Sequence, residues 1–275
     1  MNFKSNKELF KYLVTNKDEI ISLKKSATKF TDVVNLFEIE SEPVTKAKYP
    51  YENDEQKGVL KRTLLANTYN WMDSHDDVHL DGIFAESIKQ KGTKIFHLNS
   101  HQLDFSAKIG KVYSVEEKQI SWRELGQGKT GMTQGLFIGS EIRKSYNETL
   151  YNAYLSDEVD QHSVGMQYVN LALAVNDKDE YPREFEEWQK HINKIGNRKR
   201  AEDKGYFFAV YEAKLIEVSA VLLGSNELTP TLGNKIQPSE TLEFKVGPPE
   251  SSRKELMEGL NKLMFNLKIN DLCQM

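Results

Sequence analysis

The spacing of apolar residues predicts helices at the start of the chain. Ser5 and Glu8 have the spacing of a capping box, in which each side chain bonds the other residue's backbone N–H. Apolar residues then recur at helical intervals as far as Leu23. We therefore predict one or two helices over residues 5–26, depending on a break at residues 15–18.

Alternation with a period of two, or a short continuous apolar run, predicts that most of the middle of the chain is strand. We predict strands over residues 32–40, 59–71, 93–100, 109–115, 164–175, 206–213 and 214–221. The strand at 109–115 is expected to form a hairpin with 93–100, and the polar stretch 41–57 is expected to be a loop. Several short strands in succession indicate a barrel-like sheet.

Helical periodicity returns between and after these strands. It predicts helices over 81–90 and 141–155, a charged helical insertion over 176–205, and a terminal helix over 251–268. We therefore predict an α+β fold in which helices flank a β-barrel-like core. The expected divisions are a helical extension (1–30), the core domain with its insertion (31–236), and a linker with a C-terminal helix (237–275).

Composition narrows the class of protein. The chain has 275 residues, 28% of them charged, and a formal net charge of −4, so no overall basic field favours nucleic acid. We find no run of about 18 apolar residues and no apolar signal-peptide core, which predicts a protein without a membrane span or export signal. Cys273 is the only cysteine, which excludes an internal disulfide and suits a reducing cytosol.

Three residues form a candidate catalytic set. Ser163 lies between a helix-like segment and an apolar, strand-like one, and His101 lies about sixty residues before it. A serine hydroxyl becomes a nucleophile when a base, most often an imidazole, takes its proton and a third group orients that base. Glu217 is the candidate third group, since a carboxylate inside an apolar strand needs a partner.

Four motifs in one order resemble those of the HK97-type prohead (capsid maturation) serine proteases of tailed bacteriophages. Residues 73–84 resemble the pattern D-(S/R)-x-x-D-(V/I)-(V/I)-x-x-G-(A/I)-F, and residues 98–102 with 109–112 resemble L-x-x-H followed by (I/P)-(I/L)-G-x-(V/I). Residues 162–166 resemble L-S-(I/V)-G-(F/Y), and residues 215–226 resemble L-x-E-(V/I)-S-x-V-x-x-x-A-N. The resemblance covers residues 59–228.

The resemblance implies a fold similar to that of the herpesvirus capsid assembly protease, and a serine endopeptidase. Ser163 would be the nucleophile, His101 the general base and Glu217 the group that orients it, with no cofactor or metal. The implied substrates are the scaffold and major capsid proteins, cut inside the assembling prohead in the cytoplasm of a bacterial host. The implied family also allows self-cleavage near the termini and self-association.

The chain departs from the family pattern at several positions. His162 replaces the usual leucine and Met166 the usual aromatic residue, and Gly224 and Ser225 stand where proline and alanine are more common. The insertion also lengthens the path from the serine to the acid. The third catalytic member and the oxyanion hole therefore stay open, with the amides near residues 164–165 as candidates for the hole.

Other histidines compete for the catalytic roles. His97 is four residues before His101, so on a continuous strand both side chains would share a face, and His97 is the main alternative base. His75 and His79 also lie within a motif. The herpesvirus relatives use a second histidine as third member, which raises His162 and His191, although His162 should point away from the face that carries its neighbour Ser163.

Two further segments have the composition of ligand-binding loops, and two other functions stay as alternatives. The acidic residues of 73–81 lack the spacing of a calcium loop, and Gly126–Thr130 lacks the first glycine of a phosphate loop, so we interpret them as a charged turn and a loop. The alternative function is a non-catalytic head-assembly or scaffolding protein that retains the protease fold. A weaker alternative is a hydrolase of esters or small amides.

Overall fold

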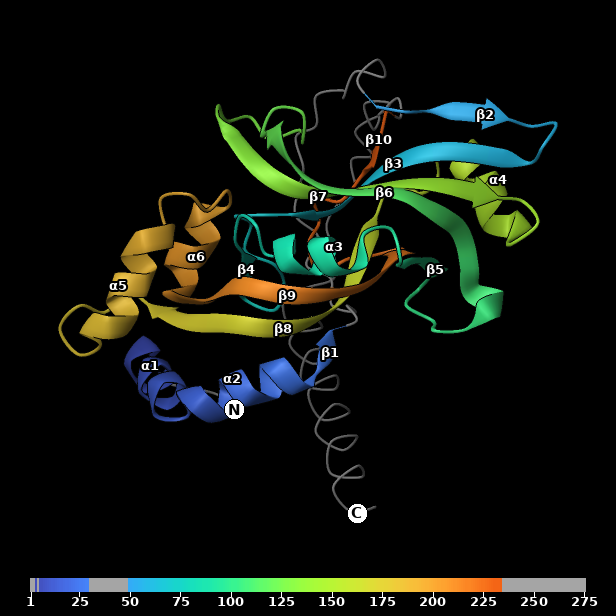
Figure 1. The fold of residues 1–275 in the computed structure, drawn as a ribbon. Helices are drawn as coiled ribbons and strands as arrows, with labels where there is room; N and C mark the ends of the chain where they lie inside the picture. The colour runs from blue at the N-terminus through green and yellow to red at the C-terminus, as the bar shows by residue number, and fades with distance from the viewer. Residues whose placement is uncertain (1–2, 4, 30–48, 234–275) are drawn as a thin grey trace, which may run out of the picture. The chain divides into compact units, whose positions relative to one another are not determined.

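The computed structural model describes residues 3, 5–29 and 49–233 and shows a mixed α+β fold (Figure 1). The strand predicted at 32–40 and the helix predicted at 251–268 lie outside the described residues.

The N-terminal segment forms two helices that pack against the rest of the chain. They are α1 (Asn6–Thr15) and α2 (Lys17–Ser26), separated by Asn16, and the Ser5 side chain accepts a hydrogen bond from the N–H of Glu8 at 3.3 Å. Phe10 and Leu13 of α1 are buried in the main core. The domain boundaries predicted near residues 31 and 236 fall at residues that the structure does not describe, and they stay predictions.

The strands form one mixed sheet. They are β1 (Thr28–Lys29), β2 (Glu52–Asp54), β3 (Val59–Thr68), β4 (Asp77–His79), β5 (Phe96–Asn99), β6 (Lys108–Ser121), β7 (Met132–Arg143), β8 (His162–Val175), β9 (Tyr206–Ala220) and β10 (Thr231–Leu232). Their order is β1-β8-β9-β5-β6-β7-β3-β10, with β2 paired to β3 and β4 paired to β9. β5 runs parallel to β9 and antiparallel to β6, as the hairpin prediction required.

The sheet curls so that its two sides meet. β3, β6 and β7 lie in one layer and β8 and β9 in another, with the main core between them (Figure 1). At one side the backbone N–H of His162, the first residue of β8, donates to the carbonyl of Thr229, and β10 then pairs with β3 through Thr231 and Leu64. This curvature is compatible with the barrel-like core predicted from the strand pattern.

The remaining helices lie at the edges of the sheet. They are α3 (Ala85–Lys91), α4 (Glu148–Leu155), α5 (Pro182–His191), α6 (Arg198–Lys204) and a short 3₁₀ helix (Phe105–Ala107). The predicted insertion is therefore helical, and Trp188, Ile192 and Ile195 of its apolar face are buried in a second core.

The sequence analysis missed one long strand, β7, and the four short strands β1, β2, β4 and β10, of which β2 lies within the stretch predicted to be a loop. β7 was not predicted, and the helix expected from residue 141 begins at Glu148, where the Asn147 side chain caps α4 by accepting from the Leu150 N–H at 2.9 Å. Gly135 and Gly139 interrupt the alternation of side chains in this strand. In addition, the two strands predicted at 206–213 and 214–221 form the single strand β9.

Candidate active site

The pairing of β8 with β9 places Ser163 and Glu217 on one face of the sheet. Ser163 lies directly opposite Ser219, and Gly165 lies opposite Glu217. Residues opposite one another in an antiparallel pair point to the same face, as do residues two apart on one strand. Ser163 is only 6% exposed, and it lies inside β8 rather than in the turn that the sequence suggested.

Gly165 makes room for the carboxylate. A Cβ atom at this position would overlap Oε1 of Glu217, so the backbone of β8 approaches the acid more closely than any side chain would allow. The glycine two residues after the serine therefore has a physical reason in this structure. It lets a fully buried carboxylate lie across β8, beside the position of Ser163.

His101 reaches the carboxylate from a turn after β5. In the parallel pairing of β5 with β9, Phe96 lies opposite Glu217, so His101 is five residues further along the chain. Ser100 and His101 have φ values of 47° and 58°, in the left-handed region, where non-glycine residues are uncommon. The turn reverses the chain and brings the imidazole back to Glu217. Backbone strain of this kind gathers at functional sites.

A compact set of hydrogen bonds fixes the imidazole. Nδ1 of His101 lies 2.6 Å from Oε1 of Glu217, and since the carboxylate accepts, Nδ1 carries the proton and the basic nitrogen of the neutral ring is Nε2. The Ser219 hydroxyl donates to Oε2 of Glu217 at 2.6 Å and accepts from the backbone N–H of His101 at 2.9 Å. The role of Ser219 was missed by the sequence analysis, although this residue belongs to the fourth motif.

The structure thus places Ser163 and Glu217 on one sheet face, and His101 contacts Glu217 from the turn after β5. Two side chains are almost inaccessible, with His101 7% and Glu217 0% exposed. The acid orients the base, and the nucleophile candidate lies on the neighbouring strand. This is the set of roles that acyl transfer by a serine requires.

His97 has a different environment from the one we expected. The turn at residues 100–101 ends the strand, so the shared face predicted for His97 and His101 does not occur. Nδ1 of His97 lies 2.9 Å from the Ser140 hydroxyl and Nε2 lies 3.1 Å from the Tyr154 hydroxyl. Burial, with a smaller effect of the nearby His162, lowers the pKa of His97 to about 3. His97 is therefore a neutral core residue.

His162 continues the same buried chain of hydrogen bonds. Its Nδ1 donates to the carbonyl of Thr229 at 2.8 Å, so its Nε2 accepts from the Tyr154 hydroxyl at 2.9 Å. Burial lowers the pKa of His162 to about 4. The prediction that His162 points away from the face of Ser163 agrees with these contacts. His191, in helix α5 of the insertion, bonds the hydroxyl of Tyr211 in β9 at 2.8 Å.

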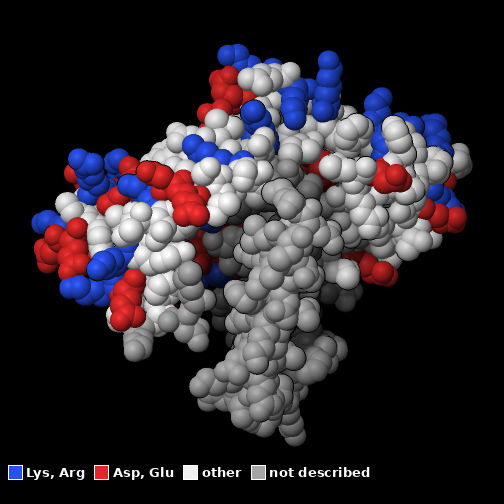
Figure 2. Space-filling view, turned by 90° about the horizontal axis from the view of Figure 1, so that it is seen from below, with Lys and Arg blue, Asp and Glu red and all other residues white. Residues whose placement is uncertain are grey.

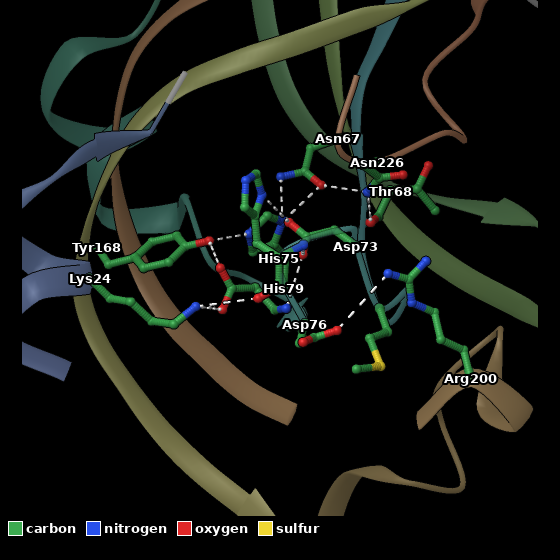
Figure 3. A network of polar contacts seen from close by, with 12 residues as sticks. Lys24, Asn67, Thr68, Asp73, His75, Asp76, His79, Tyr168, Arg200 and Asn226 are labelled. Atoms are coloured by element: carbon green, nitrogen blue, oxygen red, sulfur yellow. Dashed lines mark hydrogen bonds and ion pairs between the residues drawn. The ribbon is translucent and has the colours of Figure 1, made fainter. Parts of the chain in front are cut away.

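A second histidine and carboxylate network lies around β4 (Figure 3). The His79 ring bonds the Asn67 side chain through Nδ1 and the Tyr168 hydroxyl through Nε2, and Tyr168 donates to Oδ2 of Asp77 at 2.9 Å. Lys24 of α2 reaches Oδ1 of the same carboxylate at 2.5 Å. Most members are buried, so this network joins the N-terminal helices to the core.

Residues of the first and fourth motifs also contribute hydrogen bonds to this region. Oδ1 of Asp73 accepts from the backbone N–H groups of His75 and Asp77, which closes the turn before β4. Asn226 of the fourth motif donates to the carbonyl of Thr68 at 2.7 Å. Within the described ranges, no group of three or more histidine, cysteine, aspartate or glutamate side chains is arranged to hold a metal ion.

The loop at 126–130 has an aromatic environment. The ammonium of Lys129 lies 3.7 Å from the centre of the Trp122 ring, and burial lowers the pKa of Lys129 to about 8. This is a cation–π contact.

The surface of the described residues carries charges of both signs. On the face shown in Figure 2, lysine and arginine side chains are interspersed with aspartate and glutamate over the described residues. No helix in the described part of the chain is long and apolar enough to cross a membrane.

Comparison with known proteins does not add an identification. No model of a known protein family, no curated protein and no solved structure matches this chain.

Proposed function

We propose that this chain is a serine endopeptidase of the prohead protease type. The observation that carries the proposal is the 2.6 Å contact of His101 Nδ1 with Glu217, on the same sheet face as Ser163. The resemblance of the four motifs supports the same three residues. The geometry adds a physical role for Gly165 and Ser219, which occupy positions of those motifs.

The proposed chemistry follows from these roles. Ser163 Oγ attacks the carbonyl carbon of the scissile peptide while Nε2 of His101 takes the hydroxyl proton. Glu217 holds the imidazole and stabilises its positive charge. The C–N bond then breaks, and the leaving amine takes the proton from His101. Water next attacks the acyl-enzyme while His101 takes a proton from that water. His101 then returns that proton to Ser163 as the bond to the acyl group breaks.

The oxyanion hole stays a prediction. Val164 and Gly165 lie in the part of β8 that pairs with β9. Successive residues of an antiparallel strand direct their N–H groups to opposite sides, so one of these two amides points away from β9. That amide is the candidate donor to the oxyanion.

Two of the departures from the family pattern, His162 and Met166, have structural roles. His162 is bonded to Tyr154 and Thr229, and Met166 is 5% exposed and packed in the main core. Both residues serve the interior of the sheet. Their positions give the alternative of a non-catalytic head-assembly protein no additional support.

The proposed substrates are the scaffold and major capsid proteins of an assembling prohead, with the bacterial cytoplasm as the site of action. These assignments rest on the motif resemblance, as do self-cleavage and self-association.

A serine-reactive phosphonate probe tests the enzyme class directly. Wild type should be labelled on Ser163 and should cut co-expressed capsid and scaffold proteins, as seen by intact mass. Ser163→Ala should lose both, while Ser156→Ala, which removes a helix-capping hydroxyl on α4, should keep both. Equal masses and equal labelling for wild type and Ser163→Ala would reject the proposal.

A further inference from the structure

An apolar pocket of about 270 Å³ opens beside the proposed catalytic centre. Its lining residues are Phe96, Leu98, Leu103, Asp104, Phe105 and Lys108. These residues come from β5, just before His101, and from the segment just after it. Phe105 is 90% exposed, Leu103 65% and Phe96 52%, and exposed apolar side chains gathered in one place indicate a binding site for a ligand or partner.

The sheet register places this pocket on the same face as the catalytic set. Ser163 pairs with Ser219 across β8 and β9, Ser219 pairs with Leu98 across β9 and β5, and Leu98 pairs with Lys108 across β5 and β6. Paired residues of neighbouring strands point to the same face, so Ser163 and Leu98 lie in one row. His97, between Phe96 and Leu98, points the other way, to Ser140 and Tyr154.

The same row gives the distance from the nucleophile to the pocket. Neighbouring strands lie roughly 4.8 Å apart, so two strand spacings separate Ser163 from Leu98 by about 10 Å. An extended peptide advances about 3.3 Å per residue, and about three residues therefore cover this distance. A peptide whose scissile bond lies at Ser163 can reach the pocket with one nearby side chain.

The size and chemistry of the pocket fit a single apolar side chain. Its volume is just below the range of about 300–1,000 Å³ that is typical for whole small-molecule ligands. The polar residues of the lining interact with their own chain: Asp104 caps the 3₁₀ helix by accepting from the Ser106 N–H, and the Lys108 ammonium lies over the Tyr146 ring.

We infer that this pocket is a specificity subsite that binds a large apolar side chain of the substrate, at a fixed position about three residues from the cut bond. The inference rests on the proposed function, since it assigns a substrate class to the same site. We infer that the occupant is an extended peptide because the pocket lies on the same sheet face as Ser163 and Glu217, the residue that contacts His101.

The test compares pocket variants on a mixed peptide library, with cut positions identified by mass spectrometry. Phe105→Ala and Leu103→Ala change exposed side chains and should leave the fold intact, and Leu23→Ala, 62% exposed on α2, is the matched control. Wild type should prefer leucine or an aromatic residue at one fixed position. The pocket variants should cut such peptides about 10-fold more slowly and alanine-containing peptides almost unchanged.

Labelling by the small phosphonate probe distinguishes a failure of the proposed subsite from a failure of the proposed enzyme activity. If Ser163 is labelled in all variants but wild type shows no fixed apolar preference, or the pocket variants keep it, the subsite is rejected and the serine hydrolase stands. If the variants instead lose self-association, the pocket is a contact between two copies of the chain, and the subsite is rejected. If wild type is neither labelled nor active, both proposals fail.

Discussion

Two histidines of this protein lie near a buried carboxylate and a hydroxyl group, but the order of the groups differs. In the candidate active site, the His101 imidazole contacts Glu217 directly, and the Ser219 hydroxyl supports the carboxylate from the side. In the second network, the Tyr168 hydroxyl lies between His79 and Asp77. The residue types are similar, and the geometry decides what they can do.

The difference teaches how a reactive histidine is distinguished from a structural one. His79 bonds Asn67 with one ring nitrogen and Tyr168 with the other, and it is 1% exposed within a regular strand. His101 stands on a strained turn, next to an apolar pocket, with its Nδ1 proton held by an acid. Direct contact with a carboxylate fixes the orientation and the tautomer of an imidazole, as a general base requires.

The strongest test of the comparison replaces each histidine by the same residue. His101→Gln should lower kcat/KM for peptide cleavage by about 10⁶-fold, the scale seen when a catalytic histidine is removed from a serine protease. His79→Gln should retain activity within about 10-fold per folded molecule, because it changes the stability of the core only. Comparable losses of activity for the two variants would contradict the distinction.

The two carboxylates provide the next test. Glu217→Gln should lower kcat by about 10⁴-fold, since an amide does not hold the required tautomer of the imidazole. Asp77→Asn should destabilise the fold but leave kcat of the folded fraction nearly unchanged. The measurement is kcat with active sites counted by phosphonate labelling, and an active Glu217→Gln enzyme would remove the acid from the proposed mechanism.

Much of this site could be predicted from the sequence because its motifs are local. The pattern S-x-G around Ser163 and the pattern E-x-S around Glu217 each span three residues, and their meaning appears when β8 and β9 pair in register. The capping box at Ser5 and the helical insertion were predictable for the same reason, since both depend on local spacing.

The rest depends on contacts between distant parts of the chain. Nothing in the local pattern shows that Lys24 reaches Asp77, 53 residues away, or that Tyr154 bonds both His97 and His162. The same limit explains β7, whose Gly135 and Gly139 are needed for close contact with side chains of neighbouring strands. The turn at His101 could not be predicted because it requires a strained backbone that the tertiary structure stabilises.

A smaller effect is expected from the cation of the second network. Lys24→Met should lower the free energy of unfolding by about 2 kcal/mol, because it removes the ammonium from a fully buried carboxylate while keeping an apolar stem near Phe208. Lys199→Met, which breaks an exposed pair with Asp203, should have a much smaller effect on the free energy of unfolding. Urea unfolding in a Ser163→Ala background, free of self-digestion, checks both, and equal costs would show that the Asp77 pair contributes no more than a surface pair.

A pH-dependent effect is expected from the two histidines that burial keeps neutral. Their pKa values in the folded protein are about 3 for His97 and about 4 for His162, below the value of about 6.5 expected when unfolded. The unfolded chain therefore binds more protons between these values, so stability is fully present above pH 6.5 and falls as the pH is lowered towards 4. Each histidine should contribute a slope of about 1.4 kcal/mol per pH unit once its unfolded form is protonated.

Replacing one of these histidines measures its contribution to the pH dependence of the free energy of unfolding. His162→Gln should reduce the slope of unfolding free energy between pH 5 and 6 by roughly the contribution of one proton. Tyr154→Phe is the matched control, because it breaks the same chain of hydrogen bonds without removing a group that titrates in this range. It should lower stability at every pH and leave the slope unchanged. An unchanged slope in His162→Gln would mean that His162 binds its proton equally well in the folded and unfolded chain, and would contradict the effect of burial on this histidine.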